Sequence, residues 1–173
     1  MPHDPTPSPL ATLETCFRLL CTQPGALTID GHLLQPRLTH RPVPLDDLRS
    51  RFPQLDPHSR LAVLTVLVRR ARTGSAAWKV GLAGILLPGL RYLAVQQAQA
   101  PTTGAEARAI TWFRAALTAP TPEADCRIRW LLEATCATQA AQASGCPRYE
   151  PQRSDTALGE PRADGRKMVG LHN

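Results

Sequence analysis

The side chains that could carry acid–base or covalent chemistry are scattered along this chain. General acid–base catalysis needs a nucleophile beside a base, or two carboxylates in different environments. Asp46 and Asp47 are the best candidate pair. Adjacent residues of a helix point in different directions, however, and Asp46 suits the first turn of a helix. No glycine-rich phosphate loop follows a predicted strand, because Gly81 and Gly84 fall inside a predicted helix. We therefore expect a protein that is not an enzyme.

The cysteines and histidines do not have the spacing of metal ligands. The five cysteines contain no CxxC pair, and no two histidines stand four residues apart on one helix face. An odd number of cysteines also argues against a disulfide framework, and no neighbouring histidine would activate a thiol. We expect no metal, no cofactor and reduced, buried or incidental thiols at the following positions: Cys16, Cys21, Cys126, Cys136 and Cys146.

Positive charge is the best candidate for a functional surface on this chain. The formal charge is +6 and is carried almost wholly by arginine, an excess that a high-GC coding genome also produces. Arg60, Arg69, Arg70 and Arg72 lie on one predicted helix, and Arg91 follows on the next. Arginines near a helix C-terminus also complement the helix dipole, so they need no ligand to explain them. Contact with nucleic acid or a protein partner is the alternative.

Tryptophans flanked by apolar residues usually pack in a core. Trp78, Trp112 and Trp130 all stand in such surroundings. An exposed Trp130 could instead stack on an unpaired base.

The composition predicts an all-α protein. Hydrophobic residues make up 43% of 173 residues and aromatics only 5%. Ala and Leu dominate the apolar residues, and both lose little conformational freedom in a helix. We expect a single bundle of about five helices, with helical segments near 9–22, 44–52, 56–73, 76–99, 103–118 and 121–143. Residues 26–43 could form a two-stranded ribbon, but an isolated ribbon is marginal, so an irregular linker is favoured.

Capping signals place the helix boundaries. Ser8, Asp56 and Thr121 each precede a proline, the pattern of an N-cap followed by the first helical residue. The stretch 103–106 matches a capping box, in which Glu106 reaches back to the start of its own helix. Two buried stripes are predicted on these helices. The first consists of Leu61, Leu64, Val68 and Ala71, and the second consists of Ala109, Trp112, Phe113 and Leu117.

Residues 76–99 should form the central buried helix, kinked near Pro88 where a backbone hydrogen bond is lost. Its apolar run over 80–90 is too short to span a bilayer, so we assign it to the core and expect no membrane contact. The N-terminus lacks the basic residues of a secretory signal, which favours a cytoplasmic protein.

Three regions follow from this pattern. Residues 1–55 hold an N-terminal helix and a proline-rich irregular segment, and residues 56–145 hold the main helical bundle. Residues 146–173 are rich in charged residues, Pro and Gly, and this composition predicts a disordered tail.

Residues from about 60 to 142 resemble region 2 of bacterial RNA polymerase sigma factors, especially the extracytoplasmic-function type and sigma-like helical proteins of high-GC bacteria. The similarity is carried by LVRRARTGSAAW at 67–78, LPGLRYLA at 87–94, GAE at 104–106, WFRAAL at 112–117 and WLL at 130–132. It covers about half of the chain and implies a helical, non-catalytic transcription protein that contacts polymerase or DNA.

The positions that would perform these contacts differ from the family's pattern. Where the family's docking helix presents Asp, Gln and Glu to polymerase, this chain has Ala107, Ile110 and Thr111, and only Glu106 is kept. The stretch after Trp130, where the family places Arg and Asn for promoter DNA, has no positive charge over 133–137. Contacts with phosphate groups dominate affinity for DNA, so this helix lacks the positive side chains that would bind the DNA backbone.

Two functions are consistent with these residues. The chain could be a DNA-associated or RNA-polymerase-associated regulator with contacts at Arg60, Arg69, Arg70, Arg72, Arg91 and Trp130. Alternatively, it could be a protein-interaction or self-associating scaffold that does not bind DNA. Convergence of the arginines on one surface would favour the first function, and scattered arginines beside an exposed apolar face would favour the second.

Overall fold

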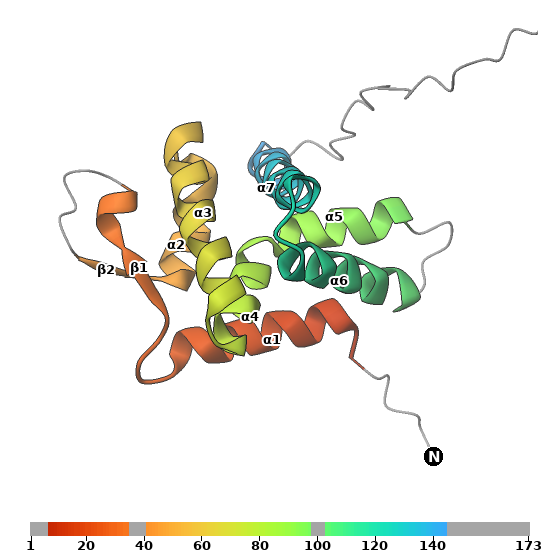
Figure 1. Ribbon diagram of the computed structural model, residues 1–173, viewed down its shortest axis with the longest axis horizontal. Coiled ribbons are helices and arrows are strands. Elements are labelled where there is room, and N and C mark those ends of the chain that lie inside the picture. Colours follow the sequence, from red (N-terminus) through yellow and green to blue (C-terminus); the bar gives the residue numbers. More distant parts are fainter. Residues whose placement is uncertain (1–6, 35–40, 98–102, 145–173) are drawn as a thin grey trace, which may run out of the picture.

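The structure, a computed structural model, describes residues 7–34, 41–97 and 103–144 (Figure 1). This part of the chain contains seven α-helices and one two-stranded sheet, which confirms the all-α prediction with more helices than expected. The helices are α1 Pro9–Thr22, α2 Leu45–Arg51, α3 Pro57–Thr73, α4 Ala76–Ile85, α5 Leu87–Gln97, α6 Thr103–Thr118 and α7 Pro122–Ala143. The predicted disordered tail lies outside the described residues.

Local signals start three of these helices as predicted. The side chains of Ser8, Asp56 and Thr121 accept hydrogen bonds from the backbone amides of Ala11, Ser59 and Ala124. A proline occupies the first helical position after each cap, where a missing N–H costs nothing. The beginnings of α1, α3 and α7 are thus set by residues that neighbour them in sequence.

The expected irregular linker after α1 is wrong, because the chain forms a short ribbon. Strands β1 (Thr28–Asp30) and β2 (Pro42–Pro44) pair antiparallel, with Ile29 opposite Val43. Short 3-10 turns follow at Gly31–Leu33 after β1 and at Phe52–Gln54 after α2. Ile29 and Val43 are both buried in the common core, which stabilises a ribbon that would be marginal alone.

The predicted kinked helix over 76–99 is two helices that meet at a corner. α4 ends at Ile85, Leu86 lies between the helices, and α5 begins at Leu87, with a bend of 73° between their axes. Pro88 lies in the first turn of α5, where it needs no hydrogen-bond acceptor. The proline therefore permits a new helix to start here instead of distorting the middle of one.

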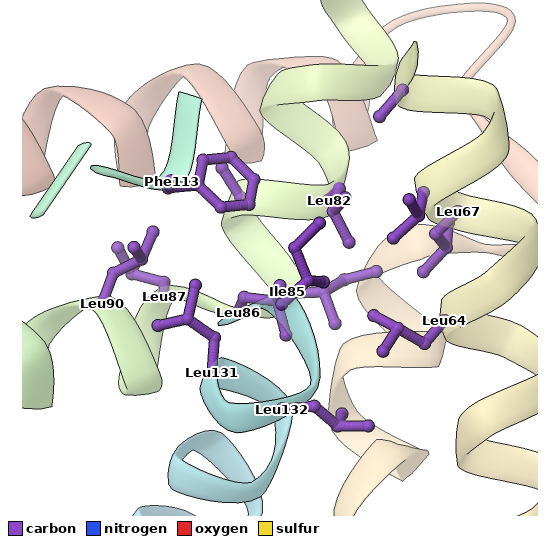
Figure 2. Close-up of a cluster of buried hydrophobic side chains, with 14 of the residues drawn as sticks. Leu64, Leu67, Leu82, Ile85, Leu86, Leu87, Leu90, Phe113, Leu131 and Leu132 are labelled. Atoms are coloured by element: carbon purple, nitrogen blue, oxygen red, sulfur yellow. The ribbon is translucent and has the colours of Figure 1, made fainter. Parts of the chain in front are cut away.

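This corner is the centre of the hydrophobic core, as the sequence predicted (Figure 2). Leu82, Ile85, Leu86, Leu87 and Leu90 are each at most 1% exposed. Side chains from three other helices lie around them, namely Leu64 and Leu67 of α3, Phe113 of α6 and Leu131 and Leu132 of α7. Leu10 and Phe17 of α1 and Leu45 and Leu48 of α2 belong to the same buried cluster.

Two residues of the predicted buried stripes lie nearer the surface. Leu61 of α3 is 38% exposed, since it precedes the part of the helix that meets the core, and Trp112 of α6 is only half-buried. Their predicted companions Leu64, Phe113 and Leu117 are buried.

No single helix in the described ranges is long and apolar enough to cross a bilayer. Only α4 and α5 taken together reach that composition, across their 73° bend.

Candidate functional site

Arg60 and Arg70 are bound to neighbouring parts of the fold. Arg60 donates from Nε to the carbonyl oxygen of Leu55 at 2.7 Å, just before α3 begins. Arg70 donates from Nη1 to the carbonyl oxygen of Thr28 at 2.9 Å, and its guanidinium lies 4.5 Å from the centre of the Trp78 ring. Arg70 thus joins α3 to strand β1 and to α4.

Arg72 connects α3 to the end of α6 and the beginning of α7. Its guanidinium donates to the carbonyl oxygens of Ala116 and Leu117, both at 3.3 Å. These carbonyls belong to the last turn of α6, where no intrahelical donor remains. Asp125 of α7 accepts a further bond from Arg72 Nη2 at 2.8 Å. Arg72 is therefore a C-terminal cap of α6.

Arg91 forms an ion pair with Glu14 of α1, which also pairs with Arg49 at 3.4 Å. Burial acts to raise the pKa of Glu14, but the two arginine charges and their hydrogen bonds outweigh it and hold the pKa below its ordinary value. This cluster fixes α1 against α2 and α5, so Arg91 also has a structural partner.

Arg69 is exposed, and it borders a hollow of about 340 Å³ between α3 and α7 together with Arg72 and Arg129. Arg60 lies twelve residues before Arg72 on the same helix, about 18 Å along its axis. Arg91 is on α5 and faces α1 through Glu14. The five arginines therefore do not form one surface.

Trp130 belongs to an aromatic patch that the sequence did not reveal. Its ring centre lies 6.2 Å from those of both Tyr92 and Trp112, with the Trp112 pair edge to face. Val95 stands one turn after Tyr92 on α5 and is 69% exposed, while Trp130 is 37% exposed. We call Tyr92, Val95, Trp112 and Trp130 the aromatic patch. Arg127 adds a cation 5.6 Å from the Trp112 ring centre.

A second feature missed from the sequence is a groove of about 620 Å³ between α4 and α6, closed by α1 and α3. Its lining combines residues from five helices, α1, α3, α4, α5 and α6, so no local pattern predicts it.

The described cysteines, histidines and carboxylates do not form a group of three that could hold a metal ion. Four cysteines in these ranges are free. Cys16 and Cys126 are exposed, and Cys21 and Cys136 are half-buried. Burial and the nearby Asp46 carboxylate raise the pKa of Cys21, which keeps this thiol protonated. Cys146 lies outside the described residues.

Glu106, the residue kept from the family's docking helix, has a partner inside the fold. Its Oε2 accepts a hydrogen bond at 3.1 Å from the backbone amide of Leu10, in the first turn of α1. The sequence had predicted that this carboxylate would cap its own helix. The observed interaction joins α6 to α1, and the residues just before α6, where that cap would form, lie outside the described residues.

The architecture is that of an all-α helical bundle with a small β-ribbon. Comparison of the chain with protein-family models, with curated proteins and with solved structures finds no match.

Proposed function

We propose that this protein is a non-catalytic helical scaffold that associates with a second copy of itself through the aromatic patch. The observation that carries this proposal is the exposure of Val95 and Trp130 beside Tyr92 and Trp112, on adjoining faces of α5, α6 and α7. Tryptophan, tyrosine and arginine are the residue types that most often dominate the binding energy of protein interfaces.

The arginines support this function over DNA binding. Arg60, Arg70, Arg72 and Arg91 donate to backbone carbonyls or carboxylates of their own chain. A guanidinium that neutralises a phosphate must give up such partners, or share them. Binding to DNA would therefore cost part of the protein's own stability.

The chemistry of the aromatic patch favours a second copy of this protein as the partner. Its four members are uncharged, so two copies can meet without placing equal charges against each other. Arg127 adds one cation beside Trp112, and Glu133 stands one turn beyond Trp130 on α7 to offer the opposite charge at the rim.

The partly exposed ring of Trp130 also supports a second candidate function, association with RNA polymerase or single-stranded promoter DNA, as the sigma-factor resemblance implies. An exposed aromatic ring can stack on an unpaired base, and Arg127 and Arg129 stand near it on α7.

Sedimentation velocity with a matched pair of variants tests self-association. Val95→Asp places a charge in the aromatic patch, and Leu19→Asp places the same charge at an exposed aliphatic position of α1, where Leu19 is 55% exposed. The wild type and Leu19→Asp should form dimers as concentration rises, whereas Val95→Asp should remain monomeric. A monomeric wild type at all concentrations, or equal behaviour of the two variants, would reject the proposal.

A DNA titration in the same buffers tests the second candidate. Single-stranded and duplex promoter-like DNA should show no saturable binding at low salt. Binding that weakens steeply with salt and is lost in Trp130→Ala would instead favour the transcription role. Retention of host RNA polymerase by the wild-type protein on an affinity column would have the same meaning.

A further inference from the structure

The groove between α4 and α6 has an apolar interior. Leu13 of α1, Val80 of α4, Leu90 of α5 and Ile110, Phe113 and Leu117 of α6 line it. Its volume of about 620 Å³ falls within the range of about 300–1,000 Å³ typical of small-molecule sites. No residue of the aromatic patch lines this groove, so the two surfaces are separate.

All charged residues that line the groove are cations, namely Arg72, Lys79 and Arg114. Arg72 is neutralised by Asp125, as described above. Lys79 of α4 and Arg114 of α6 are exposed, and neither forms an ion pair within the described part of the chain. The groove therefore combines an apolar interior with two uncompensated positive charges, one on each wall.

The groove is too small to be a protein-binding surface by itself. A volume of about 620 Å³ is that of a concave small-molecule site, which encloses most of the surface of its ligand. A helix with its side chains, about 10–12 Å across, occupies roughly 400–600 Å³ per turn, so the groove would hold little more than one turn of it. A single flexible chain of carbons suits this volume better.

We propose that the groove binds a single-chain amphiphilic carboxylate of the fatty-acid class. The alkyl chain lies along Leu13, Ile110 and Phe113, where burial removes its apolar surface from water. The carboxylate lies at the opening, where Lys79 and Arg114 supply charge-assisted hydrogen bonds. A cationic amphiphile of the same length would meet like charge and be rejected.

Isothermal titration calorimetry with three probes of equal chain length tests the role of charge. Sodium laurate, dodecyl maltoside and dodecyltrimethylammonium are each titrated below their micelle concentrations. Laurate should bind with a stoichiometry of one, the neutral maltoside more weakly, and the ammonium probe not at all. Equal binding of all three would show only general adsorption of detergent and would overturn the proposal.

Matched variants locate the site. Lys79→Ala combined with Arg114→Ala should weaken laurate binding at least about tenfold, because both charge-assisted bonds are lost. Arg18→Ala combined with Arg129→Ala removes the same charge from exposed positions outside the groove and should leave affinity unchanged. Equal losses in both double variants would show that net charge, and not the groove, attracts laurate.

A third variant blocks the chain without altering charge. Ala76 is exposed and lines the groove, so Ala76→Trp should fill part of its volume and abolish laurate binding while the circular dichroism spectrum and melting temperature stay unchanged. Unchanged laurate binding in Ala76→Trp would overturn the proposal. So would binding to phosphatidylglycerol vesicles in the absence of binding to free laurate, since the ligand would then be a membrane surface. Self-association through the aromatic patch is measured separately, so either proposal can fail alone.

Discussion

The backbone amide of Gly89 donates a hydrogen bond to Thr135 Oγ1 at 3.1 Å, where α5 crosses α7 in the centre of the protein. Gly89 is in the first turn of α5, whose amides have no intrahelical acceptor. The Thr135 hydroxyl in turn donates to the carbonyl oxygen of Leu131 at 2.8 Å, and Thr135 is fully buried. A β-carbon at residue 89 would lie 2.6 Å from Thr135 Oγ1, so only glycine permits this approach of the two helices.

Removing the Thr135 hydroxyl should leave the Gly89 amide buried without a partner. We expect Thr135→Val to lower the free energy of unfolding by about 1–3 kcal/mol, measured by urea titration. Thr138→Val is the matched control, because within the described residues the Thr138 hydroxyl donates to the carbonyl oxygen of Ala134 in its own helix. An equal loss in both variants would show that the contact between α5 and α7 adds nothing.

Adding a single methyl group at Gly89 should push α5 away from α7. We expect Gly89→Ala to reduce stability by about 1–3 kcal/mol, the usual cost of overpacking. Gly104→Ala makes the same change at an exposed helical position of α6 and should be neutral or slightly stabilising. The melting temperatures of the two variants provide the comparison, and a stable Gly89→Ala protein would mean that the helices can separate freely.

Arg72 should matter for folding in a way that Arg69 does not. The guanidinium group of Arg72 donates from two nitrogen atoms to Ala116, Leu117 and Asp125, and a lysine ammonium group cannot reproduce this geometry. Arg72→Lys should therefore lower the free energy of unfolding by about 1.5–3 kcal/mol. The carbonyl bonds should account for most of this loss, because Asp125 is half-exposed and exposed ion pairs contribute little. Arg69→Lys on the same helix should change stability by less than about 0.5 kcal/mol in the same urea titration. Equal values for the two variants would contradict the capping role of Arg72.

Glu106 should stabilise the start of α1. Glu106→Ala removes the acceptor of the Leu10 amide and should cost about 1–2 kcal/mol, while Glu106→Gln keeps an acceptor and should cost less. Glu133→Ala, at an exposed position in the middle of α7, is the control and should have little effect. Hydrogen exchange at the first turn of α1 would show the difference locally, and unchanged protection there in Glu106→Ala would reject the cap.

The Glu14 ion pairs should make stability depend on pH. The pKa of Glu14 is lower in the folded chain than in the unfolded chain, so the folded chain binds fewer protons. The contribution of Glu14 to the free energy of unfolding is complete above the ordinary carboxyl pKa, and it is lost as the pH falls through the lowered pKa. At pH 7 Glu14→Gln should lower the free energy of unfolding by about 0.5–1 kcal/mol. This effect is small because the Arg91 side chain is half-exposed.

Chemical denaturation of wild type and Glu14→Gln between pH 7 and pH 3 measures this dependence. The difference between the two proteins should narrow at the acidic end. A constant difference across the range would mean that the carboxylate charge is unimportant.

Much of the helical architecture was predictable because its signals are local. The caps at Ser8, Asp56 and Thr121 satisfy amides only three residues away, so the boundaries they set do not depend on the rest of the fold. The central position of residues 76–99 was equally predictable, since apolar side chains on nearly every face of a segment can be buried only inside the molecule.

The corner at Leu86 and the β-ribbon were predicted wrongly for one reason. Whether Pro88 kinks a helix or starts a new one depends on what packs around the corner, here Leu64, Phe113 and Leu131. The pairing of Ile29 with Val43 likewise depends on the core that covers both side chains.

The arginines also combine a feature that the local sequence predicts with one that it does not. Their positions on α3 and α5 were evident from the sequence, but their partners were not. Arg70 reaches Thr28, Arg72 reaches Leu117, and Arg91 reaches Glu14, across separations of 42, 45 and 77 residues.

The helical class, most helix boundaries and the central segment follow from the amino-acid sequence alone, because these features depend on residues within a few positions of one another. Three features emerge from the packing of the helices: most of the candidate arginines serve the fold, Trp130 lies in an exposed aromatic patch, and a cationic groove opens between α4 and α6. Each of these features is made by side chains from helices distant in sequence, and their meeting is set by how the helices pack.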